Sequence, residues 1–151
     1  MQLAPDFHIA PLPLDFLARA RAGLDDLSQP VEAHIALGGE PLRDCLRRAA
    51  PGEAILLASY CPFKLAGPYR EYGPVFIAAA PQALTALDPA YLGASFVLRA
   101  YSSKERIVDA RLSGPMSSDT DLRELFAMTE VEFVLVRFAA YGCMALRIER
   151  A

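Results

Sequence analysis

Runs of apolar residues, separated by proline and glycine, divide the first third of the chain into short elements. Phe7–Ala10 predicts a strand. After two prolines, residues 14–27 predict an amphipathic helix that stops at Pro30, because its leucines recur at helical spacing. Residues 31–37 predict a second strand, and residues 42–49 predict a short helix. The leucines expected to face inward from the first helix are Leu14, Leu17, Leu24 and Leu27.

Two continuously apolar stretches come next, Ala54–Tyr60 and Val75–Ala79, and both are typical of strands buried on both faces. The 61–73 loop between them reads CPFKLAGPYREYG and shows no periodicity. Loops of this length are uncommon in compact domains and are usually functional or flexible. This loop is therefore the first place to look for a site.

Two hairpins close the chain, and their registers follow from which faces must be buried. In the first, residues 95–101 pair with residues 105–112 so that Phe96 lies opposite Ala110. This register keeps the apolar side chains on one face and leaves Arg99 on the other. The turn then falls on Ser102, Ser103 and Lys104.

The last hairpin joins residues 131–138 to residues 142–150 through a turn at residues 139–141. With that turn, Arg137 lies directly opposite Cys143. A slip of one residue would separate them, because successive side chains of a strand point to opposite faces.

Between the hairpins, Ser117 and Ser118 with Asp121 predict a helix with a serine cap. Its inward residues are Leu122, Leu125 and Phe126. Together these elements predict an α+β fold with a mostly antiparallel sheet of about six to eight strands and two main helices on one face. A chain of 151 residues suits a single domain, 1–151.

Composition limits the kinds of binding partner and the cellular compartment that we expect for this chain. Lys and Arg number 15 against 18 Asp and Glu, for a net charge of −3, which argues against nucleic-acid binding by counterion release. Three cysteines without CxxC spacing indicate reduced thiols. The start of the chain resembles no signal peptide, and no apolar stretch reaches the roughly 20 residues of a membrane helix. We therefore expect a cytoplasmic monomer or homodimer that does not enter a membrane.

The common catalytic and nucleotide-binding motifs are missing from the sequence. His8 and His34 have no zinc-like spacing to Cys45 or Cys61, so we expect no metal and no cofactor. The acidic residues expected to lie on solvated faces are Asp25, Asp26, Glu130 and Glu132.

Arginines and tyrosines supply the first candidate site. Tyr69 and Arg70 lie in the 61–73 loop, where Arg70 could hold an anion while tyrosines wall the site. The alternative is structural, with Arg70 bonding loop carbonyls and the tyrosines covering a sheet edge. Arg43, two residues after Pro41, could add another cation.

The last two hairpins supply further candidates. Arg99 and Tyr101 share a face and could point into the same pocket, although a diagonal ion pair between Arg99 and Asp109 is the alternative. Cys143 would lie beside Arg137, whose charge would favour the thiolate. The alternative for Cys143 is a half-buried structural thiol.

The order of motifs resembles a bacterial family known as domain of unknown function 1203. The resemblance rests on PLR at 41–43, APGEAILLASY at 50–60, GPYREYGPVFI at 67–77, LRAYSS at 98–103 and GC at 142–143. It implies a small cytoplasmic domain and no established activity. Such proteins typically show PCR where this chain has Pro41, Leu42 and Arg43, and a histidine at the position of Arg137. A Cys-His pair implied by relatives would therefore be replaced here by arginine chemistry.

These observations favour a protein that binds a small anionic metabolite. The site would combine the 61–73 loop with Arg99, Arg137 and Cys143, and Cys143 would be its only plausible nucleophile. The sequence leaves open whether the ligand is also transformed. The alternative is a non-enzymatic interaction module or homodimerising structural domain that uses an exposed sheet edge.

Overall fold

The computed structural model describes residue 1, residues 3–84 and residues 86–151. The chain forms two compact units, and each has its own sheet and its own helix. Unit 1 comprises Met1–Ala10, Phe63–Arg70 and Leu92–Ala151, and unit 2 comprises Pro11–Pro62 and Glu71–Tyr91.

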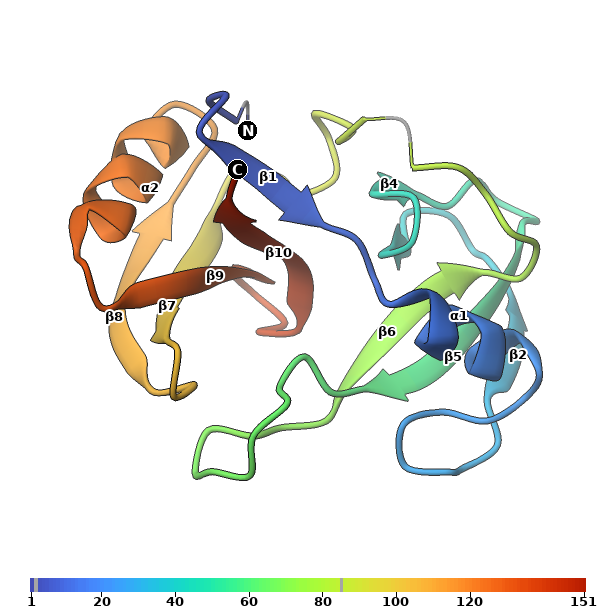
Figure 1. Ribbon diagram of the computed structural model, residues 1–151. Helices are drawn as coiled ribbons and strands as arrows, with labels where there is room; N and C mark the ends of the chain where they lie inside the picture. Colours follow the sequence, from blue (N-terminus) through green and yellow to red (C-terminus); the bar gives the residue numbers. More distant parts are fainter. Residues whose placement is uncertain (2, 85) are drawn as a thin grey trace. The chain divides into compact units, whose positions relative to one another are not determined.

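Unit 1 contains an antiparallel sheet of five strands among the described residues, in the order β1-β10-β9-β7-β8. The strands are β1 (Phe7–Ala10), β7 (Phe96–Ser102), β8 (Ile107–Ser113), β9 (Val131–Phe138) and β10 (Met144–Arg150). Because β1 pairs with β10, the two ends of the chain lie side by side (Figure 1). The N–H of Ala151 donates a hydrogen bond of 2.9 Å to the carbonyl of Asp6.

Helix α2 (Ser118–Ala127) covers one face of this sheet and packs on β8 and β9. Its buried apolar residues are Leu122, Leu125 and Phe126, as the pattern predicted. The expected serine cap is wrong, because Ser118 lies within the helix and the side chain of Ser117 makes no capping bond. Instead, the Ser113 hydroxyl donates to the Asp121 carboxylate at 2.6 Å and ties the first turn to β8.

Unit 2 contains a second sheet, in the order β2-β5-β6-β3-β4, in which β3 runs parallel to β6 and the other pairs are antiparallel. The strands are β2 (Glu32–Ile35), β3 (Pro41–Leu42), β4 (Arg47–Arg48), β5 (Ala54–Tyr60) and β6 (Gly73–Ala78). Helix α1 (Leu14–Arg21) packs on β5. The continuously apolar stretch that predicted a buried strand thus forms β5 with the predicted bounds.

Helix α1 is shorter than expected and turns a different face inward. Phe16 and Ala20 are its buried residues. The helix ends at Arg21, and Gly23 then adopts a φ of 105°, which directs the chain away from the helix axis. The leucines expected to face inward include Leu14, Leu24 and Leu27, which are 83%, 50% and 47% exposed.

The helix predicted over residues 42–49 is wrong, because β3 and β4 form a small hairpin there. One helical turn does form, since the N–H of Leu46 donates to the carbonyl of Leu42 at 2.8 Å, but Leu46 has a φ of 51° and ends it. Pairing with β6 overrides the helical pattern. The N–H of Arg43 donates to the carbonyl of Phe76 at 2.9 Å.

The register predicted for the first hairpin is wrong. Phe96 lies opposite Ser113 and not opposite Ala110. The turn begins one residue later than expected, since Ser102 pairs with Arg106, and the register shifts again between Ala100 and Tyr101. The displaced turn and the bulge together moved every pair beyond them.

The register predicted for the last hairpin is also wrong. Arg137 lies opposite Met144, and the carbonyl of Cys143 accepts the N–H of Phe138 at 3.1 Å. The cause is Gly142, whose φ of 74° makes it a fourth turn residue. Side chains of Arg137 and Cys143 are therefore not cross-strand partners.

The α+β class, the mostly antiparallel pairing and the two helices are confirmed. The described residues form ten strands in two sheets, where one sheet of about six to eight was expected, so each helix packs on its own sheet. The expectation of a single domain for residues 1–151 stays a prediction. Within the described part of the chain, neither helix has the length and apolar character needed to cross a membrane.

Candidate functional site

The two faces of the unit 1 sheet differ in what covers them. Arg111 identifies the face under α2, since it lies opposite Leu98 and pairs with Glu124 of the helix. Successive side chains of a strand point to opposite faces. Arg99, which follows Leu98, therefore lies on the face turned away from α2.

That second face carries arginines on three neighbouring strands. Leu135 of β9 is the register partner of Arg99 on one side and of Arg147 on the other. Arg137 lies two residues from Leu135 and so shares its face. Because neighbouring strands are about 4.8 Å apart, the Cα atoms of Arg99 and Arg147 are separated by about 10 Å. We call Arg99, Tyr101, Arg137 and Arg147 the arginine–tyrosine face.

Tyr101 is the best-packed member of this face. It is 1% exposed, and its ring stacks on Phe133 with centroids 5.1 Å apart and meets Phe63 edge-on at 5.2 Å. Burial raises the pKa of its hydroxyl, whereas a hydrogen bond from Arg99 opposes that rise. Tyr69 lies close enough to raise the same pKa slightly. Arg99 and Tyr101 thus share one face of β7, as the alternation predicted.

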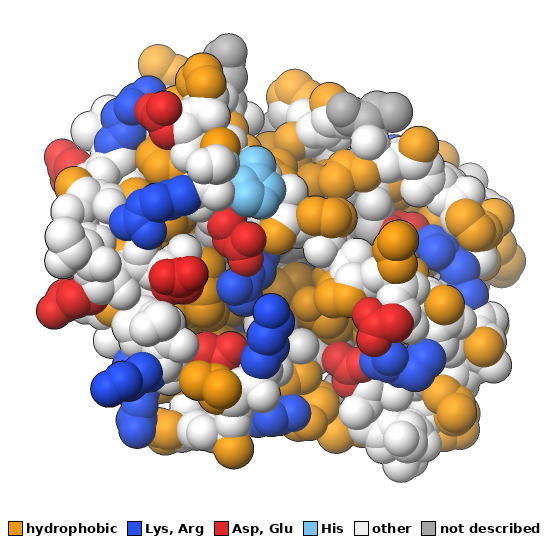
Figure 2. Space-filling view, viewed as in Figure 1, with side chains coloured by type: hydrophobic (Ala, Val, Ile, Leu, Met, Phe, Trp, Pro, Cys, Tyr) orange, Lys and Arg blue, Asp and Glu red, His pale blue; other side chains and the backbone are white. Residues whose placement is uncertain are grey.

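Arg147 is a member of the face that sequence reasoning missed. Its guanidinium carbon lies 3.6 Å from the centroid of the Phe133 ring, and its Nε donates to Glu149 at 2.6 Å. His8 of β1 lies 3.8 Å from the other oxygen of Glu149. Figure 2 shows acidic and basic side chains meeting on the surface where β1 and β10 run. The sequence signal for Arg147 was the alternation of residues along β10, which places it on the face of that strand with the polar side chains.

Arg137 is 6% exposed, although arginine is seldom buried to this extent. Its Nη1 donates to the carbonyl of Gly142 at 3.0 Å. Burial lowers the pKa of Arg137, and the charge of nearby Cys143 acts in the opposite direction. The side chains thus interact despite the shifted register. Cys143 itself is half-buried, with its sulfur 3.7 Å from the carbonyl of Tyr141.

The 61–73 loop is shared between the units, because Phe63–Arg70 belongs to unit 1 and the flanking residues belong to unit 2. Tyr69 is 40% exposed, and Arg70 is exposed with its N–H donating to the carbonyl of Gly67 at 3.1 Å. The start of the loop is bonded to Glu105 in the β7–β8 turn. Glu105 has a φ of 55°, a conformation that costs an L-residue about 1–2 kcal/mol.

Arg43 lies in unit 2, whereas the other candidate residues lie in unit 1. Its side chain is buried, and its Nη1 donates to the carbonyl of Pro41 at 2.7 Å. Burial raises the pKa of the nearby Tyr91 hydroxyl, and the positive charge of Arg43 opposes that rise. No unit therefore contains the full expected set of candidates among the described residues.

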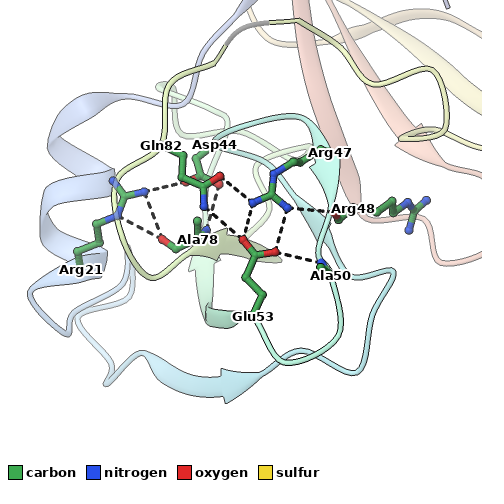
Figure 3. A network of polar contacts seen from close by, with 8 residues as sticks. All are labelled: Arg21, Asp44, Arg47, Arg48, Ala50, Glu53, Ala78 and Gln82. Carbon is green, nitrogen blue, oxygen red and sulfur yellow. Dashed lines mark hydrogen bonds and ion pairs between the residues drawn. The ribbon is translucent and has the colours of Figure 1, made fainter.

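Unit 2 has a separate polar network, drawn in Figure 3, that joins α1 to β4, to β6 and to the loops beside them. The Asp44 side chain is 1% exposed and accepts hydrogen bonds from Arg21 at 2.7 Å and from the Ala78 N–H at 3.1 Å. Arg47 pairs with Glu53, and this bond holds the pKa of Glu53 at about 2. The two carboxylates already accept bonds from protein donors, which indicates a structural role for the network.

Two acidic residues expected on a solvated face are instead part of the loop after α1. Asp25 is 8% exposed, and its carboxylate accepts three backbone N–H groups. Asp26 pairs with Arg19 at 2.6 Å and accepts the N–H of Cys61 at 2.9 Å. Their adjacency to a turn was the missed signal, because aspartate side chains commonly organise turns. Glu130 and Glu132 are exposed, as expected.

A comparison with protein families matches residues 39–150 to the family described as "Protein of unknown function (DUF1203)". The chain belongs to the DUF1203 family. The resemblance carried by its motifs is thereby confirmed, and the DUF1203 range includes every candidate residue from Arg43 to Cys143 as well as Arg147. Neither a curated protein nor a solved structure matched the chain. Among the described residues, no three histidine, cysteine or acidic side chains are grouped as around a metal ion.

Proposed function

We propose that the arginine–tyrosine face of unit 1 binds a small anionic ligand. The observation that carries the proposal is the position of Leu135, which has Arg99 and Arg147 as its two register partners and Arg137 beside it on the same face. Like charges this close repel one another, and a bound anion offsets the repulsion. Guanidinium groups match carboxylate and phosphate oxygens in bidentate fashion.

The members of the face have different roles in this proposal. Arg99 is half-buried and lies on the same face of β7 as Tyr101, so a ligand that it binds would also meet the tyrosine. Arg137 is desolvated, and a charge in such a setting interacts strongly with an anion. Arg147 already pairs with Glu149, so it shapes the face more than it adds charge. Cys143 would be the nucleophile only if the ligand is also transformed.

The test is a thermal-shift screen with inorganic phosphate, pyrophosphate and small dicarboxylates, followed by calorimetry on any hit. A ligand present at 100 times its dissociation constant stabilises the folded protein by about 2.7 kcal/mol. We expect a hit with the natural sequence and at least a tenfold weaker dissociation constant for Arg99→Met and Arg137→Met. The same screen is run on Arg123→Met as a control.

Arg123 is a matched control because it lies on α2, over the opposite face, and its side chain is 50% exposed. Its replacement should leave the dissociation constant unchanged. The proposal fails if no probe shifts the melting temperature, or if the Arg123 variant loses as much affinity as the other two.

One observation favours an alternative, an interaction module. All four residues of β2 are exposed, and Ile35 at the end of this edge strand is 67% exposed. An edge strand presents unpaired backbone groups to a second strand. Pairing of β2 with a second copy would give a dimer by light scattering that Ile35→Lys disrupts. A concentration-independent monomeric mass would exclude it.

A further inference from the structure

Glu105 occupies a position in the β7–β8 turn where glycine or asparagine is the usual residue. Its N–H donates to the carbonyl of Ser102 at 2.8 Å, and the N–H of Ser102 donates to the carbonyl of Arg106 at 2.9 Å. A hairpin closed in this way places its last loop residue in the left-handed region. Glu105 does so, with a φ of 55°. A residue that breaks a local rule calls for a compensating contact.

The carboxylate of Glu105 makes that contact with the loop of unit 1. One oxygen accepts the N–H of Lys64 and the other accepts the N–H of Leu65, both at 2.8 Å. Two successive N–H groups directed at one carboxylate form charge-assisted bonds, which are stronger than neutral ones. We call Glu105 with these two N–H groups the Glu105 clasp.

The Glu105 clasp fixes the segment that reaches over the arginine–tyrosine face. Phe63 directly precedes the clasp, and its ring packs edge-on against Tyr101 at 5.2 Å. At the other end of the segment, Tyr69 exerts a small electrostatic effect that raises the pKa of the Tyr101 hydroxyl. Phe63, at the start of the segment, thus contacts Tyr101 directly, next to the two residues that the clasp holds.

We propose that the Glu105 clasp is a latch that keeps the segment Phe63–Arg70 closed over the arginine–tyrosine face, and that ligands reach this face when the clasp opens. Tyr101 is 1% exposed and Arg137 is 6% exposed, so a ligand that touches them must first displace a covering group. Phe63 is such a group, since it contacts Tyr101 directly. The part that concerns ligand entry rests on the proposed anion site, and the latch itself does not.

The latch is tested by measuring hydrogen exchange at individual backbone amides of the intact protein with NMR. Glu105→Gly removes the carboxylate and also relieves the left-handed strain. Exchange at Lys64 and Leu65 should accelerate by about tenfold or more, because two charge-assisted bonds are lost. The melting temperature should not fall. Glu105→Gln, which keeps one acceptor oxygen, should give an intermediate acceleration, and the exposed Glu132→Gln should give none.

Faster exchange confined to the loop supports the latch, because global destabilisation would accelerate the core amides as well. Unchanged exchange at Lys64 and Leu65 in both Glu105 variants overturns it. Ligand entry is tested with inorganic phosphate as the probe. Phosphate should bind and dissociate faster in Glu105→Gly than in the natural sequence, and equal rates overturn the entry step. If the natural sequence binds no anion, the anion site fails, while the exchange result still decides the latch.

Discussion

Asp25 is the residue whose replacement should most clearly destabilise unit 2. Its Oδ1 accepts the N–H groups of Leu27 and Gln29 at 2.8 and 2.9 Å, and its Oδ2 accepts the N–H of Ser59 at 3.2 Å. Hydrogen bonds to a charged group contribute about 1.5–3 kcal/mol each. Because bonds that share one carboxylate are not additive, we expect Asp25→Ala to lower the free energy of unfolding by about 3–5 kcal/mol.

Asp25→Asn separates the contributions of the hydrogen bonds that the two carboxylate oxygens accept. The amide oxygen can still accept the bonds of Leu27 and Gln29, but the amino group faces the Ser59 N–H and cannot accept it. The expected loss is about 1–3 kcal/mol, smaller than for alanine. Asp15→Asn is the matched control, since the Asp15 side chain is 75% exposed and exposed ion pairs such as its pair with Arg19 contribute little to stability.

The assay is urea unfolding followed by circular dichroism at pH 7, with the free energy extrapolated to water. The expected order of destabilisation is alanine, then asparagine, then the Asp15 control. A free energy of unfolding for Asp25→Ala within 1 kcal/mol of the natural sequence would refute the reasoning, because an unsatisfied buried N–H group alone should cost about that much.

Three further predictions concern single side chains. The bond from Arg47 holds the pKa of Glu53 at about 2, below its ordinary value of 4.5. The stability that ionised Glu53 contributes is therefore present above pH 4.5 and lost as the pH falls through 2. Glu53→Gln should flatten the fall in unfolding free energy over that range, and an unchanged pH slope would contradict this. Burial raises the pKa of the Cys45 thiol to about 11, so iodoacetamide at pH 8 should modify Cys143 well before Cys45. Mass spectrometry measures the two rates, and equal rates would contradict the prediction. Burial lowers the pKa of Arg137, so the fold disfavours its charge, and Arg137→Met should change the unfolding free energy by less than about 1 kcal/mol. The same variant should bind an anion at least tenfold more weakly. A loss of unfolding free energy above about 3 kcal/mol would make Arg137 structural.

The strands were the most predictable part of the fold, and the turns the least. β5 has the bounds that its continuous apolar run predicted, and β9 has the bounds predicted for the first strand of the last hairpin. Registers depend instead on single backbone conformations. Gly142 in the left-handed region lengthens one turn, and Leu46 in the same region ends a helical turn where composition favours a helix. Apolar periodicity carries no information on either.

The candidate site was predictable only where alternation along a strand decides it. Arg99 and Tyr101 are two residues apart on one strand, so their shared face follows from the sequence. Arg147 was missed because alternation shows which residues lie on the polar face of β10 but not which of them lies over an aromatic ring. Arg43 was grouped with the others although it belongs to unit 2. Nothing in the local pattern marks where the chain passes from one sheet to the other.

The pairing of β1 with β10 has a consequence for synthesis on the ribosome. Unit 2 ends at Tyr91, so its sheet can be completed while residues 92–151 are still being translated. Phe7, by contrast, can pair only after its partner Arg150 has been synthesised. Domains tend to fold as their residues emerge. The nascent chain should therefore gain protease resistance in two steps, the second of them only after β10 has emerged from the ribosome.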